Sequence, residues 1–264
     1  MKKYFCVSDV HSFYDEMMMA LNGKGFDINN PEHIVCILGD LFDRGSKTIE
    51  CYEFAKNLHA QNRLIYIKGN HESLLFDCVE QIRRGEVPDR HHFSNGTGKT
   101  ICQFCHQSEW IIYDLSWKDE ICKIMQPVLD FIDKSCVNYF EIDDKILVHS
   151  WIPTLTHDCL PPYYIRNRNW EYNPEWKSAS LNDWDDATWG NPFVMAYRGL
   201  NQTGKTLVFG HWHCSTGWSK AENRTEFGED AKFEPFYGDG IIGIDACVAH
   251  SGKINCIVIE DKNS

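Results

Sequence analysis

The sequence predicts an α/β fold built around a largely parallel sheet. Two observations support this prediction: apolar, strand-like runs alternate with amphipathic helical patterns as far as residue 84, and acidic, amide and imidazole side chains follow directly after the apolar runs. Parallel strands end at one edge of a sheet, where functional groups gather. A chain of 264 residues, 43% of them hydrophobic, is long enough to bury a sizeable core.

The first part of the chain is expected to follow the order β-α-β-α-β-α. Short apolar runs indicate strands, and apolar residues at every third or fourth position indicate helices. The expected elements are, in chain order, a strand at 3–8, a helix at 13–21, a strand at 33–38, a helix at 48–59, a strand at 64–68 and a helix at 71–84. Such units connect parallel strands through right-handed crossovers.

The rest of the chain is less regular. Residues 86–143 read as a helical insertion into a single domain that spans 1–264. Residues 151–197 form an aromatic-rich excursion, with ten aromatic side chains where the overall 13% content predicts about six. Its prolines break it into loops and short helices over one end of the sheet. Short strands are expected at 139–142, 145–148, 206–209, 240–245 and 253–259.

Charge and apolar runs limit the partners and the location. Lys and Arg number 26 and Asp and Glu 38, so the net charge of −12 repels nucleic-acid backbones and argues against nucleic acid as a partner. We expect no membrane association, because no apolar run approaches the ~20 residues that cross a bilayer. The first apolar stretch is too short for a signal peptide. Twelve scattered cysteines fit buried free thiols, and we expect a cytoplasmic location.

Five clusters of metal-ligand side chains follow apolar runs. They are Asp9-x-His11, Asp40-x-x-Asp43-Arg44, Asn70-His71, His149 and His211-x-His213. Carboxylate, amide oxygen and imidazole together suit divalent ions such as Mn²⁺, Fe²⁺ or Zn²⁺, whereas carboxylates alone would favour Mg²⁺ or Ca²⁺. A single cluster of this kind is more often a loop with capping residues and a hydrogen-bonded histidine than a metal site. Five in order, each at a strand end, indicate a metal site.

These clusters belong to motifs that resemble those of a known family. GDLFDRG at 39–45 and GNHE at 69–72 are the specific ones. The order of motifs is similar to that of the calcineurin-like metallophosphoesterases, and within them to the phosphoprotein-phosphatase branch with its bacterial serine/threonine protein phosphatases. The resemblance implies a β-sandwich of mixed sheets flanked by helices, with the active site at the strand C-terminal ends.

The sequence departs from that branch at a few motif positions. Ser8 and Ser12 stand where the first motif has glycines, and Ser150-Trp151 follow His149 in place of two glycines. In the last motif, His213 is the second histidine of the wider superfamily, whereas the branch has threonine after the first histidine. The alternative for His213 is a hydrogen bond to a neighbouring carboxylate.

The resemblance also implies a set of metal ligands. The first metal would be bound by Asp9, His11 and His213, the second by Asn70, His149 and His211, and Asp40 would bridge both. A shared carboxylate holds two cations about 3.5 to 4 Å apart, where a water between them loses a proton near neutral pH and attacks phosphorus in line. The implied cofactors are two divalent ions, Mn²⁺ first, with Fe or Zn as alternatives.

Three further side chains acquire roles by the same resemblance. His71, which follows a metal ligand without being one in the family, would be the general acid. Asp43 would hold its imidazole in the productive tautomer, and the planar fork of Arg44 suits two phosphoryl oxygens. A second phosphate-binding arginine is expected among Arg166, Arg168 and Arg198, between which the sequence does not choose.

The expected function is hydrolysis of a phosphorylated substrate, a protein or a small molecule, by a two-metal enzyme. The first interpretation is a phosphate monoesterase of the serine/threonine protein phosphatase type or a related promiscuous phosphatase. The alternative is a nucleotide or dinucleoside polyphosphate hydrolase of the same superfamily, whose purine the aromatic excursion could stack. A third possibility, a non-catalytic binding scaffold, would show the loss of a ligand or of His71.

Overall fold

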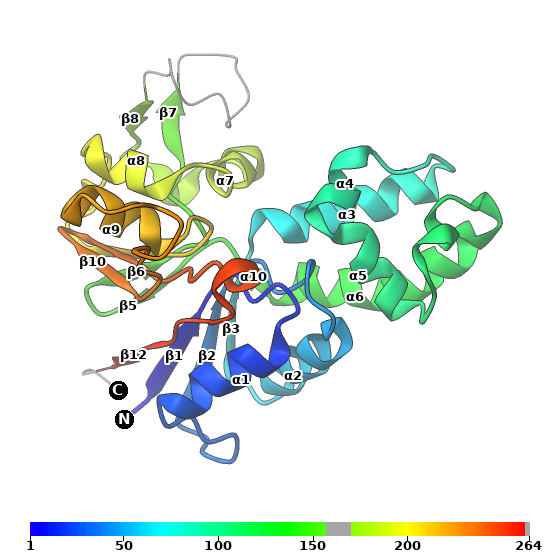
Figure 1. Ribbon diagram of the computed structural model, residues 1–264, viewed down its shortest axis with the longest axis horizontal. Coiled ribbons are helices and arrows are strands. Elements are labelled where there is room, and N and C mark those ends of the chain that lie inside the picture. The colour runs from blue at the N-terminus through cyan, green and yellow to red at the C-terminus, as the bar shows by residue number, and fades with distance from the viewer. Residues whose placement is uncertain (157–169, 262–264) are drawn as a thin grey trace.

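The computed structural model describes residues 1–156 and 170–261, in which two mixed sheets pack face to face with helices on their outer sides (Figure 1). The first sheet has the order β12-β1-β2-β3-β4 and the second the order β10-β11-β9-β6-β5. Strands β1 to β4 are parallel, and β12 pairs with β1 in the antiparallel sense. The predicted α/β sandwich of mixed sheets flanked by helices is confirmed.

The strands are short and the helices vary in length. The strands are β1 (Lys3–Val7), β2 (His33–Leu38), β3 (Leu64–Ile67), β4 (Cys136–Val137), β5 (Phe140–Ile142), β6 (Lys145–Leu147), β7 (Thr154–Thr156), β8 (Trp170–Tyr172), β9 (Thr206–Phe209), β10 (Phe236–Gly238), β11 (Ile241–Gly243) and β12 (Ile257–Glu260). The α-helices are α1 (Tyr14–Gly23), α2 (Thr48–Ala60), α3 (Asn70–Arg83), α4 (Arg90–Asn95), α5 (Thr97–Phe104), α6 (Lys118–Ser135), α7 (Leu181–Ala187), α8 (Pro192–Tyr197), α9 (Cys214–Glu222) and α10 (Val248–Ser251).

Both faces of the first sheet are buried, which explains why its strands read as continuous apolar runs. Successive side chains of a strand point to opposite faces. In β1, Phe5 and Val7 join the core beneath the helices, whereas Tyr4 and Cys6 join the core between the two sheets. A strand covered on both faces needs apolar side chains at every position.

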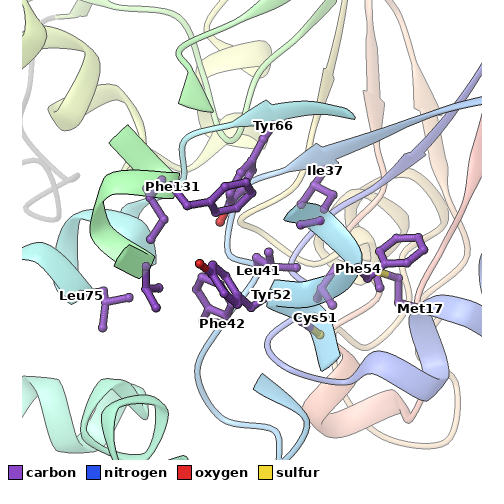
Figure 2. Close-up of a cluster of buried hydrophobic side chains, with 14 of the residues drawn as sticks. Met17, Ile37, Leu41, Phe42, Cys51, Tyr52, Phe54, Tyr66, Leu75 and Phe131 are labelled. Atoms are coloured by element: carbon purple, nitrogen blue, oxygen red, sulfur yellow. The ribbon is translucent and has the colours of Figure 1, made fainter. Parts of the chain in front are cut away.

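The larger core lies between the first sheet and the helices around it. Figure 2 shows Met17 of α1, Phe54 of α2 and Ile37 of β2 in this cluster, together with Phe131 of α6. Helices α3 to α6 gather beside the sandwich in Figure 1. The helical part of the 86–143 segment therefore packs on the same core as α1 and α2.

Part of the aromatic-rich excursion packs on the outer side of the second sheet. Trp151, Trp170, Trp176, Trp184 and Phe193 are buried in one cluster with the strands β6 and β9. These aromatic side chains therefore form core. Residues 157–169 of the excursion lie outside the described residues, and the single-domain interpretation of 1–264 stays a prediction.

The sequence-based boundaries hold well in the first 84 residues and less well later. The expected strand at 240–245 is β11, which ends at Gly243, and only the last part of 253–259 forms β12. The side chain of Asn255, just before β12, donates a hydrogen bond to the carbonyl of Phe233 at 2.6 Å. Within the described ranges, no helix combines the length and hydropathy needed to cross a membrane.

Candidate metal centre

The predicted ligands meet where the two sheets adjoin. Asp9 and His11 follow β1, Asp40 follows β2, and Asn70 begins α3 directly after β3. From the second sheet, His149 follows β6 and His211 follows β9. All six side chains lie at the C-terminal ends of parallel strands. The residues of this site are almost fully buried apart from His211, which is partly exposed.

Asp40 lies at the centre of the cluster. Its Oδ2 is 3.8 Å from Nε2 of His11 and 3.8 Å from Nε2 of His71, while its Oδ1 is 3.5 Å from Nε2 of His149. Burial would raise the pKa of this carboxyl, but the histidines around it, led by His149, outweigh burial and lower the pKa from its ordinary value. Asp40 is therefore a carboxylate shared by imidazoles on both sides.

On one side of Asp40, three electron-pair donors face one another. Nδ1 of His149 donates to the carbonyl of Leu38 at 2.8 Å, which leaves Nε2 as the nitrogen that can offer a lone pair to a metal. That Nε2 lies 2.9 Å from Oδ1 of Asn70 and 3.2 Å from Nδ1 of His211. Burial and the neighbouring His149 lower the pKa of His211 to about 3, so the His211 ring is neutral near pH 7. Converging lone pairs repel unless a cation lies between them, and this set fits a divalent ion.

On the other side, His11 is oriented in the same way. Its Nδ1 donates to the carbonyl of Phe42 at 2.9 Å, which leaves the lone pair of Nε2 directed toward Asp40. Burial, then His71 and Arg44, lower the pKa of His11. A ligand histidine with its second nitrogen held by a carbonyl is the usual arrangement in metal sites.

Asp9 and Asp245 add buried carboxyl groups near Asp40. Oδ2 of Asp9 accepts the backbone N–H of His211 at 2.8 Å. Burial and the nearby Asp245 and Asp40 raise the pKa of Asp9, and burial raises the pKa of Asp245 to about 6. Carboxyl groups crowded out of water need a compensating cation. The donor set as a whole therefore fits two divalent metal ions, and the buried clusters are consistent with a binuclear site.

Beside the ligands lies the predicted acid group. Nδ1 of His71 is 2.6 Å from Oδ2 of Asp43, and Nη2 of Arg44 is 3.3 Å from the other ring nitrogen. Burial lowers the pKa of His71, but Asp40 and Asp43 outweigh it and the pKa is raised. Because Asp43 holds Nδ1, Nε2 is the nitrogen left to exchange a proton with a substrate.

His213 lies apart from the two groups of converging ligand atoms. Its Nδ1 is 2.8 Å from Oγ of Ser215 and its Nε2 is 3.5 Å from Oε1 of Glu226. Its ring also packs against Phe227, with centroids 4.7 Å apart. The approach to Glu226 is at ion-pair distance and brings the ring near a carboxylate, as in the alternative to ligation. Metal ligation by His213 stays a prediction.

The structure describes two of the four candidate phosphate-binding arginines, Arg44 and Arg198. Arg44 is exposed beside His71. The exposed guanidinium of Arg198 lies over the ring of Trp170, 4.8 Å from its centroid. Arg166 and Arg168 lie outside the described residues, so a second clamp stays a prediction.

Glu72 is a structural residue of the site, and the sequence analysis predicted no role for it. Its carboxylate is buried and accepts the N–H groups of Asp40, Leu41 and Gly69 and the hydroxyl of Tyr66, at 2.7 to 3.0 Å. It thus joins the loop after β2 to the start of α3. A signal was available, because a glutamate at the third position of a helix commonly bonds the N-cap N–H.

The backbone of the site is held in an uncommon conformation. Six of the predicted site residues have positive φ angles: Asp9, His11, Asp40, Asp43, Arg44 and His211. Such angles cost of order 1 to 3 kcal/mol each for residues other than glycine and persist only where the surroundings enforce them. Gly69 is needed for close approach, because a Cβ there would collide with Oδ1 of Asp40.

Known proteins share parts of this sequence. Residues 2–215 match the model of the calcineurin-like phosphoesterase family. The chain is 35% identical over 79 residues to an asymmetrical bis(5'-nucleosyl)-tetraphosphatase of Bacillus subtilis, and 34% identical over 89 residues to a symmetrical one of Actinobacillus succinogenes. These matches cover 28% and 34% of this chain, and about a third of each relative, 32% and 30%.

A solved structure shares the fold. The cold-active protein-tyrosine phosphatase of a psychrophilic Shewanella species superposes with a TM-score of 0.53 over 99% of this chain and 76% of that one, at 15% sequence identity. At this identity the likeness concerns the fold alone. The family match spans β1 to the start of α9 and so contains the strand-end loops from Asp9 to His213. This chain belongs to the calcineurin-like phosphoesterase family.

Proposed function

We propose that this chain is a two-metal phosphohydrolase that cleaves dinucleoside polyphosphates. The observation that supports this proposal is the match to two relatives that are both named bis(5'-nucleosyl)-tetraphosphatases. It favours the nucleotide alternative over the protein phosphatase interpretation. Since the chain matches only about a third of each relative, the substrate is decided by experiment.

The proposal assigns the ligands as two sets that share Asp40. One set is Asp9, His11 and His213, and the other is Asn70, His149 and His211. The geometry supports Asn70, His149 and His211 most directly, because their donor atoms already face one another at 2.9 and 3.2 Å. Mixed oxygen and imidazole donors suit Mn²⁺, with Fe or Zn as alternatives.

The side chains around the metals would then divide the chemistry. Two bound divalent ions supply charge neutralisation at the phosphoryl group and a water of lowered pKa. Arg44 would hold two phosphoryl oxygens with its guanidinium and add positive charge where negative charge gathers. The attack of water on phosphorus breaks the P–O bond to the leaving group, and Nε2 of His71 would give that oxygen its proton.

The two substrate classes differ in how much they need this proton. The leaving oxygen of a phosphoanhydride belongs to a phosphate, which is stable as an anion at neutral pH. The leaving oxygen of a serine or threonine ester is a strongly basic alkoxide. Loss of His71 should therefore impair ester hydrolysis more than anhydride hydrolysis.

The test is a substrate panel with the purified, Mn²⁺-loaded protein. Diadenosine tetraphosphate, ATP, a phosphoserine peptide and p-nitrophenyl phosphate are compared by kcat/KM, with an Asp40→Asn variant as the control for contaminating phosphatases. We expect kcat/KM for diadenosine tetraphosphate to exceed that for the phosphopeptide at least tenfold. Chromatography then separates a symmetrical cut, which yields two ADP, from an asymmetrical one, which yields ATP and AMP.

Two other results of the substrate panel would favour a different function. A preference for the phosphopeptide would establish the protein phosphatase interpretation in place of this one. Failure to hydrolyse any of the four substrates with both metals bound would point to the binding scaffold. The negative charge of −12 supports a small-molecule or protein substrate over nucleic acid, and the cytoplasmic location stays a prediction.

A further inference from the structure

Helix α5 (Thr97–Phe104) runs beside the loop that carries Asp43 and Arg44. It belongs to the helical insertion, in which the sequence shows no strand-end motif. One side chain and three backbone groups of this loop are nevertheless hydrogen-bonded to side chains of α5. The helix therefore contacts the proposed catalytic groups directly.

Two threonine hydroxyls of α5 hold the carboxylate of Asp43. Oγ1 of Thr97 donates to Oδ2 at 2.9 Å, and Oγ1 of Thr100 donates to Oδ1 at 2.6 Å. Both threonines and Asp43 are buried. With one oxygen bonded to each hydroxyl, the carboxylate plane is fixed, and Oδ2 is presented to Nδ1 of His71 at 2.6 Å.

The same helix holds the backbone of the loop. Oγ1 of Thr100 accepts the N–H of Asp43 at 3.0 Å, Nζ of Lys99 donates to the carbonyl of Arg44 at 2.8 Å, and Nε2 of Gln103 donates to the carbonyl of Gly45 at 3.1 Å. Three consecutive loop residues are thus bonded to a single helix.

These bonds act on a strained segment. Asp43 and Arg44 have φ angles of +77° and +58°, which side chains other than glycine rarely adopt. The turn before α5 approaches so closely that a Cβ on Gly96 would lie 2.5 Å from the backbone nitrogen of Arg44. Two adjacent left-handed residues persist only when neighbours enforce them, and α5 supplies those neighbours.

We propose that α5 is the positioning element for the proton donor and the phosphate fork, with Thr97 and Thr100 as positioning residues that act on His71 through Asp43, and Lys99 as one that acts on Arg44. This inference rests on the proposed phosphohydrolase function. It adds that α5 positions the groups that act on the substrate, in addition to packing on the core.

The experiment compares Thr97→Val, Thr100→Val and Thr100→Ser with the full-length, Mn²⁺-loaded protein. Valine keeps the shape of threonine and removes the hydroxyl, whereas serine keeps the hydroxyl. Phenyl phosphate and p-nitrophenyl phosphate are the two substrates, because phenolate leaves poorly and needs the acid more than p-nitrophenolate does. Thr203→Val is the matched control, since its hydroxyl bonds Asn201 at the opposite end of β9.

We expect each valine variant to lower kcat on phenyl phosphate at least tenfold more than on p-nitrophenyl phosphate, with KM and the metal content unchanged. Thr100→Ser should restore kcat to within about threefold of wild type, and Thr203→Val should leave both rates unchanged. Lys99→Gln, at an exposed position, should raise KM several-fold with little change in kcat.

Equal losses on both substrates, or losses that follow a fall in metal content, would overturn the inference and leave α5 a structural helix. If Thr100→Val does not fold, Thr97→Val decides alone, because it leaves the N–H of Asp43 paired with Thr100. A wild-type protein that hydrolyses neither ester nor anhydride would instead refute the proposed function.

Discussion

His149 and Leu38 lie 111 positions apart in the chain and are joined by the hydrogen bond from Nδ1 of His149 to the carbonyl of Leu38, at 2.8 Å. Leu38 ends β2 in the first sheet, and His149 follows β6 in the second. The bond fixes which nitrogen of His149 faces Asn70 and His211. The geometry of the candidate metal centre therefore depends on how the two sheets pack together.

His149 and His71 should differ in what they contribute. We expect His149→Ala to lower the metal content by about one ion per chain, because its Nε2 faces the other ligand atoms. His71→Ala should keep both metals and lose about 10²- to 10⁴-fold in kcat on an ester substrate, the usual contribution of a general acid. Elemental analysis beside the rate measurement checks both, and the reverse pattern would exchange the two roles.

Removal of the metals should abolish activity and lower stability. Without cations, the buried Asp9, Asp40 and Asp245 repel one another, and ions that bind the folded chain stabilise it by mass action. We expect p-nitrophenyl phosphate hydrolysis and the Tm to fall together after dialysis against a chelator and to return with Mn²⁺. Full activity in protein shown by elemental analysis to be metal-free would contradict the two-metal mechanism.

Glu72 should be important for stability as well as for the site. Glu72→Gln replaces an acceptor by a group with two N–H donors that face the N–H groups of Asp40 and Gly69. We expect the free energy of unfolding of the metal-free protein to fall by about 2 to 4 kcal/mol. Denaturant titration measures this loss. The exposed Glu53→Gln is the control, and an equal effect in both variants would refute the role of Glu72.

The buried His92 should make stability depend on pH. Burial and the adjacent His91 lower its pKa, while Asp77, 3.0 Å from Nε2, and Asp89 oppose this. The unfolded chain therefore binds a proton below about pH 6.5 that the folded chain binds less readily, and the free energy of unfolding falls as the pH drops, by at most about 1.4 kcal/mol per unit.

Denaturation of wild type and His92→Gln at pH 7.5, 6 and 5 measures this effect. The variant should show a shallower decline than wild type, and the exposed His59→Gln should follow wild type. Identical slopes for wild type and His92→Gln would show that another group carries the acid sensitivity.

If His213 is a metal ligand, His213→Ala should lower the occupancy of one metal. Glu226→Gln is the matched control, because it weakens the contact of 3.5 Å that the ring makes in this structure and keeps the imidazole. We expect Glu226→Gln to retain both metals. If His213→Ala also retained both at limiting Mn²⁺, the last motif would function like that of the protein phosphatase branch.

The sequence predicts the strand-end loops well because local patterns determine them. The runs at 33–38 and 206–209 coincide with β2 and β9, and the predicted ligands that follow them converge as the parallel topology requires. Apolar runs and turn residues are short-range signals, and the common edge of a parallel sheet follows from them.

Local sequence patterns do not predict long-range contacts or strained backbone conformations. The two-residue strand β4 exists only because β3 lies beside it. Thr97 and Thr100 look like ordinary helix residues until Asp43 is brought to them from more than 50 positions away. The left-handed conformation of Arg44 contradicts its local preference, and such conflicts are expected at functional sites.

The positive φ angles of the site residues have a consequence for directed evolution. Glycine adopts this conformation without the penalty, so replacing the exposed Arg44 by glycine would relieve about 1 kcal/mol of strain while removing the guanidinium. A library selected for heat resistance alone would accordingly enrich inactive clones with changes in these loops. Stability and turnover therefore have to be selected together in this protein, because residues with a proposed role in hydrolysis are among those that the fold holds in strained conformations.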